Sequence, residues 1–286
     1  MNDKTFAAFI SPSVILMVLL MVFPFGTAIW LGLNQITFAN LAHPNYIGFQ
    51  NYADVLHDPA FWHSMQFTLV YVVITMPVQI LLGFVIASLL DQVTHLRGLI
   101  ISISLLPHIV APIVGTLIFR NTFDQGGIYA YLYRLIVNKE LIWTTLSVKT
   151  VIILEGIWSS TPFAMITLFA GLQTLDREQI EAATVDGANF LQKIRYVVVP
   201  HLRSLILFIA LMSTMDGYRV FDSILVITKQ NPMFKADTIM YYTFKTALTF
   251  QELGKANAMS VITVIGIFVV LIPFLVSTYR QQLEKR

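Results

Sequence analysis

Three charged residues interrupt an apolar stretch of the chain near residue 220. Asp216, Arg219 and Asp222 are spaced three apart, which on a helix places them within a sector of about 120° and sets Arg219 one turn from a carboxylate on either side. In a membrane such charges are costly unless they are paired or face water, so they mark a functional site by default. The same spacing also suits an internal ion-pair brace for a bent helix, and the two roles are compatible.

A second stretch, residues 176–200, carries the densest charge away from the chain ends and is too polar for a membrane. Asp176 can cap a helix N-terminus, and Gln179 stands where it would complete a capping box. The Asp-Gly pair that ends in Gly187 predicts a helix stop, because glycine accepts the left-handed conformation. A second short helix is expected over about residues 188–196. The stretch therefore predicts a helix–turn–helix elbow in water.

The composition of the chain indicates an integral membrane protein. Of the 286 residues, 56% are hydrophobic and only 12% are charged, about half the usual charged share of a soluble domain. The net charge of +2 argues against a nucleic-acid partner, which would require a basic patch. The absence of cysteine excludes disulfides, thiolate metal sites and a cysteine nucleophile.

Nucleotide-binding and catalytic motifs are missing from the sequence. The Gly254-Lys255 pair is followed by Ala256, so there is no phosphate-binding loop, and neither a Gly-x-Ser-x-Gly nor a His-Glu-x-x-His motif occurs. Three histidines of one loop, at positions 43, 57 and 63, have no convincing metal-site spacing. We therefore expect no catalytic residue, metal or cofactor on this chain, and any ATP must be hydrolysed by another chain.

The apolar segments predict a single all-α membrane domain over residues 1–286, with six spans at about 6–33, 67–90, 99–119, 151–172, 197–228 and 256–279. Pro107 and Pro112 should kink or unwind the third span, where His108 either faces a cavity or is packed and hydrogen-bonded. A short apolar helix near 128–137 is expected along the membrane interface. The charge-free core of the fifth span, 204–215, is too short to cross a bilayer alone.

The orientation of the spans is only partly readable from charge. Residues 34–66 contain no Lys or Arg, which suits an external loop, and the C-terminal tail is basic. An even division of the basic residues between the two sides leaves the total uninformative. The first apolar segment is longer than the core of a signal peptide and has no small-x-small cleavage site close behind it, so we interpret it as a retained anchor.

The elbow resembles the EAA loop of ABC-importer permeases. Glu-Ala-Ala at 181–183 is followed by Gly187 at the family spacing and then by Val197-Val198-Val199-Pro200, where the family has Ile-x-Leu-Pro. The resemblance implies a coupling helix that docks into a groove of an ATPase subunit, with Phe190 as an apolar plug. The coupling residues it implies are Glu181, Ala182, Ala183, Asp186, Gly187, Phe190 and Pro200. The alternative is an ordinary amphipathic loop between two spans.

Further motifs resemble the MalF-like first permease of sugar ABC importers. They are Ile47-Gly48, Asn51-Tyr52 and Asp58-Pro59-x-Phe61-Trp62 before the second span, Arg219-x-Phe221-Asp222, Val226-x-Thr228 and Pro232 after the fifth, and Gly254, Ala258 and Ser260 before the last. One departure is Gln230-Asn231, where the family has Gly-Gly. The resemblance implies a type I permease of the bacterial inner membrane with both termini in the cytoplasm. It also implies a second permease, an external binding protein and two ATPase subunits that hold ATP and Mg.

The same family moves sugars, oligosaccharides, polyols and glycerol phosphates, so the resemblance implies a solute pathway along spans four and five. Aromatic rings stack on sugar faces, and carboxylates and arginine hydrogen-bond hydroxyl groups. The residues expected along the pathway are Trp158, Ser159, Ser160, Thr161, Asp216, Tyr218, Arg219, Phe221 and Asp222. The sequence names neither the solute nor the choice between homodimer and heterodimer.

Two other classes of protein fit the sequence less well. A stand-alone proton-coupled transporter could use Glu155, Asp216 and Asp222 as a relay, but the chain has no detectable inverted repeat and the elbow would be unexplained. An intramembrane hydrolase has no nucleophile and base at useful spacing. The ABC permease is therefore the favoured interpretation.

Overall fold

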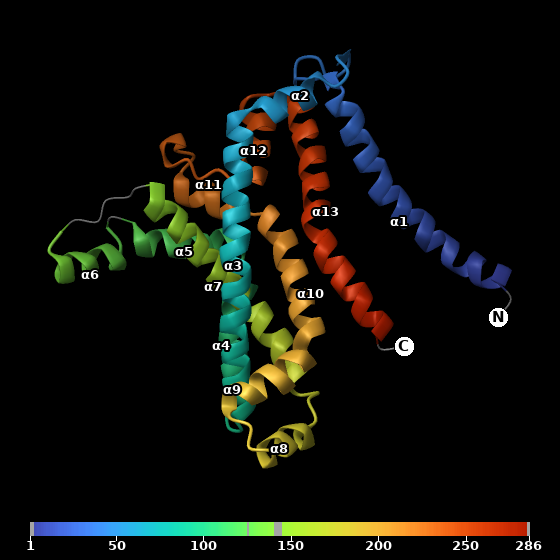
Figure 1. Ribbon diagram of the computed structural model, residues 1–286. Helices are drawn as coiled ribbons and strands as arrows, with labels where there is room; N and C mark the ends of the chain where they lie inside the picture. The colour runs from blue at the N-terminus through green and yellow to red at the C-terminus, as the bar shows by residue number, and fades with distance from the viewer. Residues whose placement is uncertain (1–2, 125, 140–144, 285–286) are drawn as a thin grey trace. The chain divides into compact units, whose positions relative to one another are not determined.

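The computed structural model describes residues 3–124, 126–139 and 145–284, which are mostly α-helical (Figure 1). The chain divides into two compact units. The first unit comprises residues 1–64 and 239–269, and the second comprises 65–238 and 270–286. Helices α3 (Pro59–Gln92) and α13 (Leu253–Glu284) contribute residues to both units.

The first unit contains α1 (Asp3–Gly32), a two-stranded antiparallel sheet of β1 (Asn34–Gln35) and β2 (Asn45–Tyr46), α2 (Gln50–His57), α12 (Ile239–Phe244) and a π-helical turn (Lys245–Thr249). Asn51 secures the turn after α1, because its amide Nδ2 donates to the carbonyl oxygens of Gly32 and Asn34, each at 2.9 Å. Gly254 lies so close to the Asn34 carbonyl that a β-carbon would clash with it. The sequence motifs around Asn51 and Gly254 therefore meet in space.

A second contact of the first unit joins the start of α3 to α12 and α13. The half-buried side chain of Asp58 accepts hydrogen bonds from the hydroxyl of Tyr242 at 2.8 Å and from Nζ of Lys255 at 3.1 Å. Burial by itself raises the pKa of Asp58, but these two bonds, with one from the Ala60 amide, outweigh it and leave the pKa below its ordinary value.

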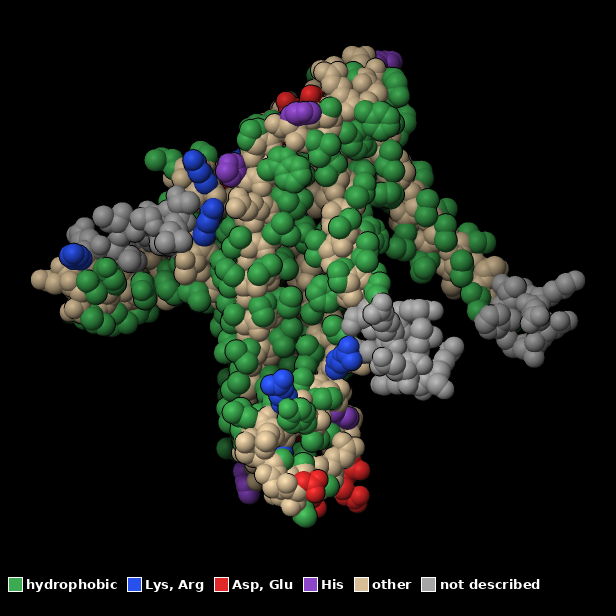
Figure 2. Space-filling model, in the orientation of Figure 1, with side chains coloured by type: hydrophobic (Ala, Val, Ile, Leu, Met, Phe, Trp, Pro, Cys, Tyr) green, Lys and Arg blue, Asp and Glu red, His purple; other side chains and the backbone are tan. Residues whose placement is uncertain are grey.

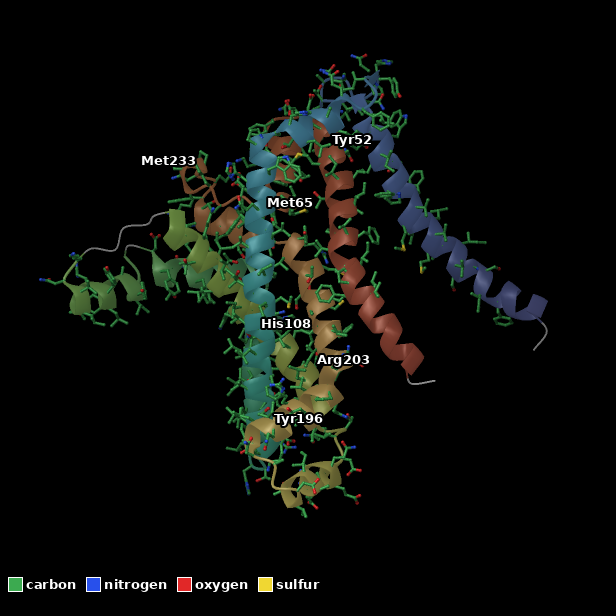
Figure 3. The ribbon with its side chains drawn as sticks, in the orientation of Figure 1. Tyr52, Met65, His108, Tyr196, Arg203 and Met233 are labelled. Carbon is green, nitrogen blue, oxygen red and sulfur yellow. The ribbon has the colours of Figure 1, made fainter. Side chains whose placement is uncertain are left out.

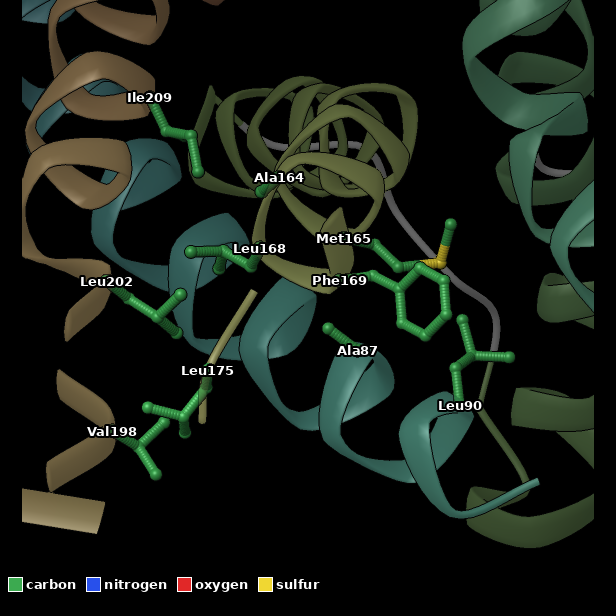
Figure 4. Packing of buried hydrophobic residues seen from close by; sticks show 10 residues of the cluster. All are labelled: Ala87, Leu90, Ala164, Met165, Leu168, Phe169, Leu175, Val198, Leu202 and Ile209. Carbon is green, nitrogen blue, oxygen red and sulfur yellow. The ribbon is translucent and has the colours of Figure 1, made fainter. Parts of the chain in front are cut away.

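The second unit contains most of α3 together with α4 (Arg97–Ile109), α5 (Pro112–Phe123), α6 (Ile128–Val137), α7 (Thr145–Leu172), α8 (Arg177–Val185), α9 (Phe190–Lys193), a π-helical turn (Ile194–Val198), α10 (Val199–Tyr218), α11 (Asp222–Thr228) and a 3-10 turn (Pro232–Phe234). Its core is a cluster of apolar side chains shared by α3, α7, α10 and the segments beside them (Figure 4). The buried residues of this cluster are Ala87, Leu90, Ala164, Met165, Leu168, Phe169, Leu175, Val198, Leu202 and Ile209.

Five described helical segments are long and apolar enough to cross a membrane, and a sixth span is obtained if one bent pair of helices is counted. That pair begins with α4 and α5, which are separated at Val110 and Ala111, so the kink predicted for the third span is confirmed. The prolines explain it, because Pro112 cannot donate a backbone hydrogen bond and starts α5. The apolar helix expected near residues 128–137 is present as α6.

Two predicted helices have different bounds in the structure. The second span begins with α3 at Pro59, eight residues earlier than expected, because the amide of Ala60 bonds the side chain of Asp58 and starts the helix there. The second helix of the elbow is not separate. It starts at Phe190 and continues through the π-helical turn into α10, so that one apolar helical segment runs from Phe190 to Tyr218.

The fifth span, predicted over about residues 197–228 with a bent helix, is interrupted near its end. Helix α10 ends at Tyr218, and α11 begins at Asp222 after a break at 219–221. The carbonyl freed at Val220 accepts a 2.7 Å hydrogen bond from the hydroxyl of Thr238. The break therefore satisfies its own backbone, as buried or membrane-embedded chain must.

Candidate functional site

The break between α10 and α11 borders a cavity of about 460 Å³ in the second unit. Val110 and Pro112, at the break between α4 and α5, also line it, so both interrupted helices border the same space. The volume falls within the usual range for a small-molecule site, about 300–1,000 Å³. Its lining combines polar and aromatic residues from α3, α4, α7 and α10, with apolar side chains filling the gaps.

Seven of the nine residues predicted for the pathway line this cavity: Trp158, Ser159, Ser160, Asp216, Arg219, Phe221 and Asp222. The other two do not line it. Thr161 is buried and donates to the carbonyl of Ile157 at 2.6 Å, and Tyr218 is also buried. The helical spacing of the sequence could not separate these two from their neighbours, because the direction of each side chain depends on how α7 and α10 pack.

The aromatic side of the cavity is assembled from α4, α5 and α7. The Trp158 ring packs against Phe119, with 5.1 Å between ring centroids, and rests on Gly115 of α5. His108, labelled in Figure 3, lines the cavity, and its Nδ1 donates to the Ser159 carbonyl at 3.1 Å. His108 therefore both faces the cavity and is hydrogen-bonded, the two alternatives that the sequence left open.

A buried carboxylate lies at the junction of three helices. Glu155 of α7 is only 4% exposed. It accepts a hydrogen bond of 2.5 Å from the hydroxyl of Ser223 on α11 and one of 3.4 Å from Thr116 on α5. The guanidinium of Arg120 adds a bond of 3.2 Å to the carbonyl of Val226 on α11. These contacts fasten the short helix α11 against α5 and α7.

The predicted ion-pair series of the fifth span is only half formed. Arg219 and Asp216 approach to 3.7 Å, but both side chains are mostly exposed, so the pair contributes little stability. Asp222 forms no ion pair with Arg219 among the described residues, because the helix ends between them. The brace expected on one continuous helix is therefore absent, and the charges face the cavity instead.

A polar stripe on α3 was not predicted from the sequence. Tyr71, Thr75 and Gln79 line the cavity, and Gln79 donates from Nε2 to the hydroxyl of Ser213 on α10. Their spacing of four residues puts them on one face of a helix. Polar residues repeating at this interval within an apolar span were the signal that could have found them.

The elbow forms a second candidate site, at the end of the second unit where α8 and α9 lie (Figure 1). The Asp176 side chain caps α8 by accepting from the Glu178 amide at 3.0 Å. The predicted stop is confirmed, because Gly187 has a φ of +80° just after α8. The observed capping box belongs to α9, where Asn189 and Gln192 bond each other's backbone amides at 2.9 and 2.7 Å.

Large apolar side chains are exposed around the elbow. Val185, Phe190, Leu191 and Tyr196 are each more than two-thirds exposed, and acidic side chains gather at the same end of the unit (Figure 2). Glu181 and Phe190 line a hollow of about 700 Å³ with the C-terminal parts of α3 and α7. Ala182, Asp186 and Pro200 are exposed and Ala183 is half-buried, with Pro200 in the first turn of α10.

Comparison with known proteins identifies the class. A family model described as the inner membrane component of binding-protein-dependent transport systems matches residues 67–286. The chain belongs to this family. It is therefore a permease, a transport subunit rather than an enzyme. Its several long apolar helices agree with a location in a membrane.

Individual relatives agree with this assignment. The chain is 32% identical to a probable ABC transporter permease, y4oQ of Sinorhizobium fredii, over 82% of this chain and 77% of the relative. It is 30% identical to SugA, the trehalose transport permease of Mycobacterium tuberculosis, over 77% of this chain and 71% of the relative. A bacterial ABC transporter that imports the acidic polysaccharide alginate has the same fold, with a TM-score of 0.78, 18% identity and coverage of 98% of this chain and 96% of that chain.

Proposed function

We propose that the chain is one of two permease subunits of an ATP-driven importer for sugars or oligosaccharides. Family membership and the relative named for trehalose transport support the solute class. The observation that carries the proposal is the polar cavity between two interrupted helices, since broken helices line solute sites in membrane transporters.

In this proposal the cavity is the chain's part of the solute pathway. Trp158 and Phe221 offer rings for the apolar face of a sugar. Ser159, Ser160 and Asp222 offer groups that bond its hydroxyls. The cavity of this single chain is not closed. In the proposal, the second permease supplies the missing wall.

The elbow is the proposed connection to an ATPase subunit. Exposed apolar side chains on a water-facing segment mark a protein interaction surface, and Phe190 is 69% exposed there. Ile180 of α8 packs against the apolar core shared by α3 and α7, so a force on α8 is passed to these two helices. The continuous segment from Phe190 to Tyr218 then leads directly to the cavity.

The remaining assignments rest on the resemblance to ABC-importer permeases. We propose on that ground that the elbow faces the cytoplasm, as do both termini, and that the loops between residues 33 and 58 meet the external binding protein. ATP and Mg are held by the two ATPase subunits, and this chain holds no cofactor of its own.

The test is co-purification of the chain with the products of its neighbouring genes, followed by ATPase assays with and without binding protein and candidate sugars. We expect a stable complex whose ATP turnover rises with one loaded binding protein. A chain that purifies alone and moves solute in liposomes on a proton gradient would refute the proposal in favour of a secondary transporter.

A further inference from the structure

We propose that the cavity of the second unit selects solutes by charge, admitting uncharged or amino-bearing saccharides and rejecting those that carry carboxylates. The inference rests on the proposed function, because it assigns a solute class to the same cavity. Glu155 and Asp222 are the specificity-determining residues, and each can be changed without altering its size.

The lining carries more negative than positive groups. Three carboxylates, those of Glu155, Asp216 and Asp222, line the cavity with one guanidinium, that of Arg219. With Glu155 ionised the balance is three to one, and with Glu155 protonated it is two to one. The lining is therefore net negative in either state.

The guanidinium of Arg219 is paired with Asp216. Among the described residues, the carboxylates of Glu155 and Asp222 form no ion pair. Arg219 lies 3.7 Å from Asp216, whereas Glu155 accepts hydrogen bonds from the neutral hydroxyls of Ser223 and Thr116. A cleft with walls of low dielectric focuses such a field, so an incoming carboxylate is repelled and an ammonium group is attracted.

A buried hydroxyl points independently to a polar, uncharged ligand group. Tyr71 lines the same cavity and is only 5% exposed. Its hydroxyl has no hydrogen-bond partner among the described residues, although buried polar groups are normally bonded. A phenol both donates and accepts, which matches the hydroxyl groups of a saccharide.

The fold alone does not impose this selection. The transporter of the same fold that imports alginate handles an acidic polysaccharide, so the fold is compatible with anionic solutes. This chain's contribution to discrimination therefore depends on the side chains that line its cavity, and these carry a net negative charge.

The absence of cysteine makes the cavity's field measurable. In the assembled complex, Ser160→Cys places a single thiol of this chain in the cavity. Its reaction rates with a cationic and an anionic methanethiosulfonate of similar size are compared at one fixed pH. Relative to a free neutral thiol, we expect the cationic reagent to be favoured on the order of tenfold, the scale for one or two charges nearby.

Matched variants test the assignment. Adding Glu155→Gln and Asp222→Asn to Ser160→Cys should bring the ratio close to that of the free thiol. The same two changes should leave the ratio unaltered at Thr94→Cys, a control on the exposed loop between α3 and α4. Equal rates at Ser160→Cys, or a preference for the anionic reagent, would overturn the inference.

Transport provides the second arm and separates the two proposals. ATP turnover of the complex, with its binding protein, is measured with a neutral saccharide, the matching amino sugar and the matching uronate. Stimulation by the uronate would overturn charge selection while leaving the importer intact. Failure of the complex to form would refute the proposed function, whereas a complex that forms and is stimulated by its solute, but shows equal thiol rates, would refute charge selection alone.

Discussion

The turn after α8 offers a sharp test of the elbow. Gly187 has a φ of +80°, and no atom lies within 4 Å of where its β-carbon would stand. The amides of Gly187 and Ala188 close the helix by donating to Thr184 and Ala183 at 3.1 and 2.9 Å. A substitution here therefore meets backbone strain without any steric clash.

The size of the effect follows from the backbone alone. The left-handed conformation costs an L-residue with a β-carbon about 1–2 kcal/mol, but asparagine adopts it readily. Replacing Gly187 by Ala should therefore weaken docking of the elbow about 5- to 30-fold. Replacement by Val should weaken it at least as much, because a β-branched residue is a stronger outlier at positive φ. Replacement by Asn should cost less than about threefold.

The assay is retention of the ATPase subunits on the tagged permease, together with solute-stimulated ATP turnover. Gly98→Ala is the matched control, because Gly98 is also without a neighbour within 4 Å but has no positive φ. We expect ATPase retention and stimulated turnover to be highest for the Asn variant, lower for the Ala variant, and equal to or lower than the Ala level for the Val variant. If Asn, the larger residue, were as harmful as Val, size rather than backbone strain would govern the site and the reasoning would be wrong.

Two further predictions concern the first unit. Gly254→Ala should destabilise the first unit by about 1–3 kcal/mol, because the new β-carbon meets the main chain of β1. The control Gly266→Ala, which has open space around the new β-carbon, should be neutral or stabilising. Equal melting temperatures of the two variants would contradict the prediction. The second concerns Asp58, whose pKa is lowered by its bonds to Tyr242 and Lys255 despite burial. A lowered pKa adds stability that is present above the unfolded value of about 3.9 and is lost as pH falls through the folded value. The melting-temperature advantage of wild type over Asp58→Asn should therefore persist from pH 7 to about 5 and shrink below about 4, and an advantage independent of pH would exclude the mechanism.

Much of the helical framework could be predicted from local sequence. Long apolar segments must satisfy their backbone internally, which favours helices, and the expected segments are helical. The stop at Gly187 and the break before Pro112 were also predictable, because each depends on one residue's own dihedral angles or missing donor. These features need no information from distant parts of the chain.

The turn before Pro232 has a backbone conformation that its residue types did not predict. Gln230 stands where relatives of the MalF-like type have glycine, and it adopts a φ of +61°. The side chain of Asn231 then accepts from the Met233 amide at 3.0 Å. Gln230 thus adopts a conformation suited to glycine without being one, which the sequence did not predict.

Tertiary structure decided the shape of the site. No proline interrupts residues 216–222, and their charges repeat with helical spacing, so local sequence favours a continuous helix there. The chain breaks because distant groups compensate for it: Thr238 bonds the freed carbonyl of Val220, and Glu155 fastens Ser223. Gly217 also lets α10 approach α3 more closely than a β-carbon would allow. Sequence alone therefore determined which residues are polar within the membrane, whereas packing between remote helices determined which of them share a cavity.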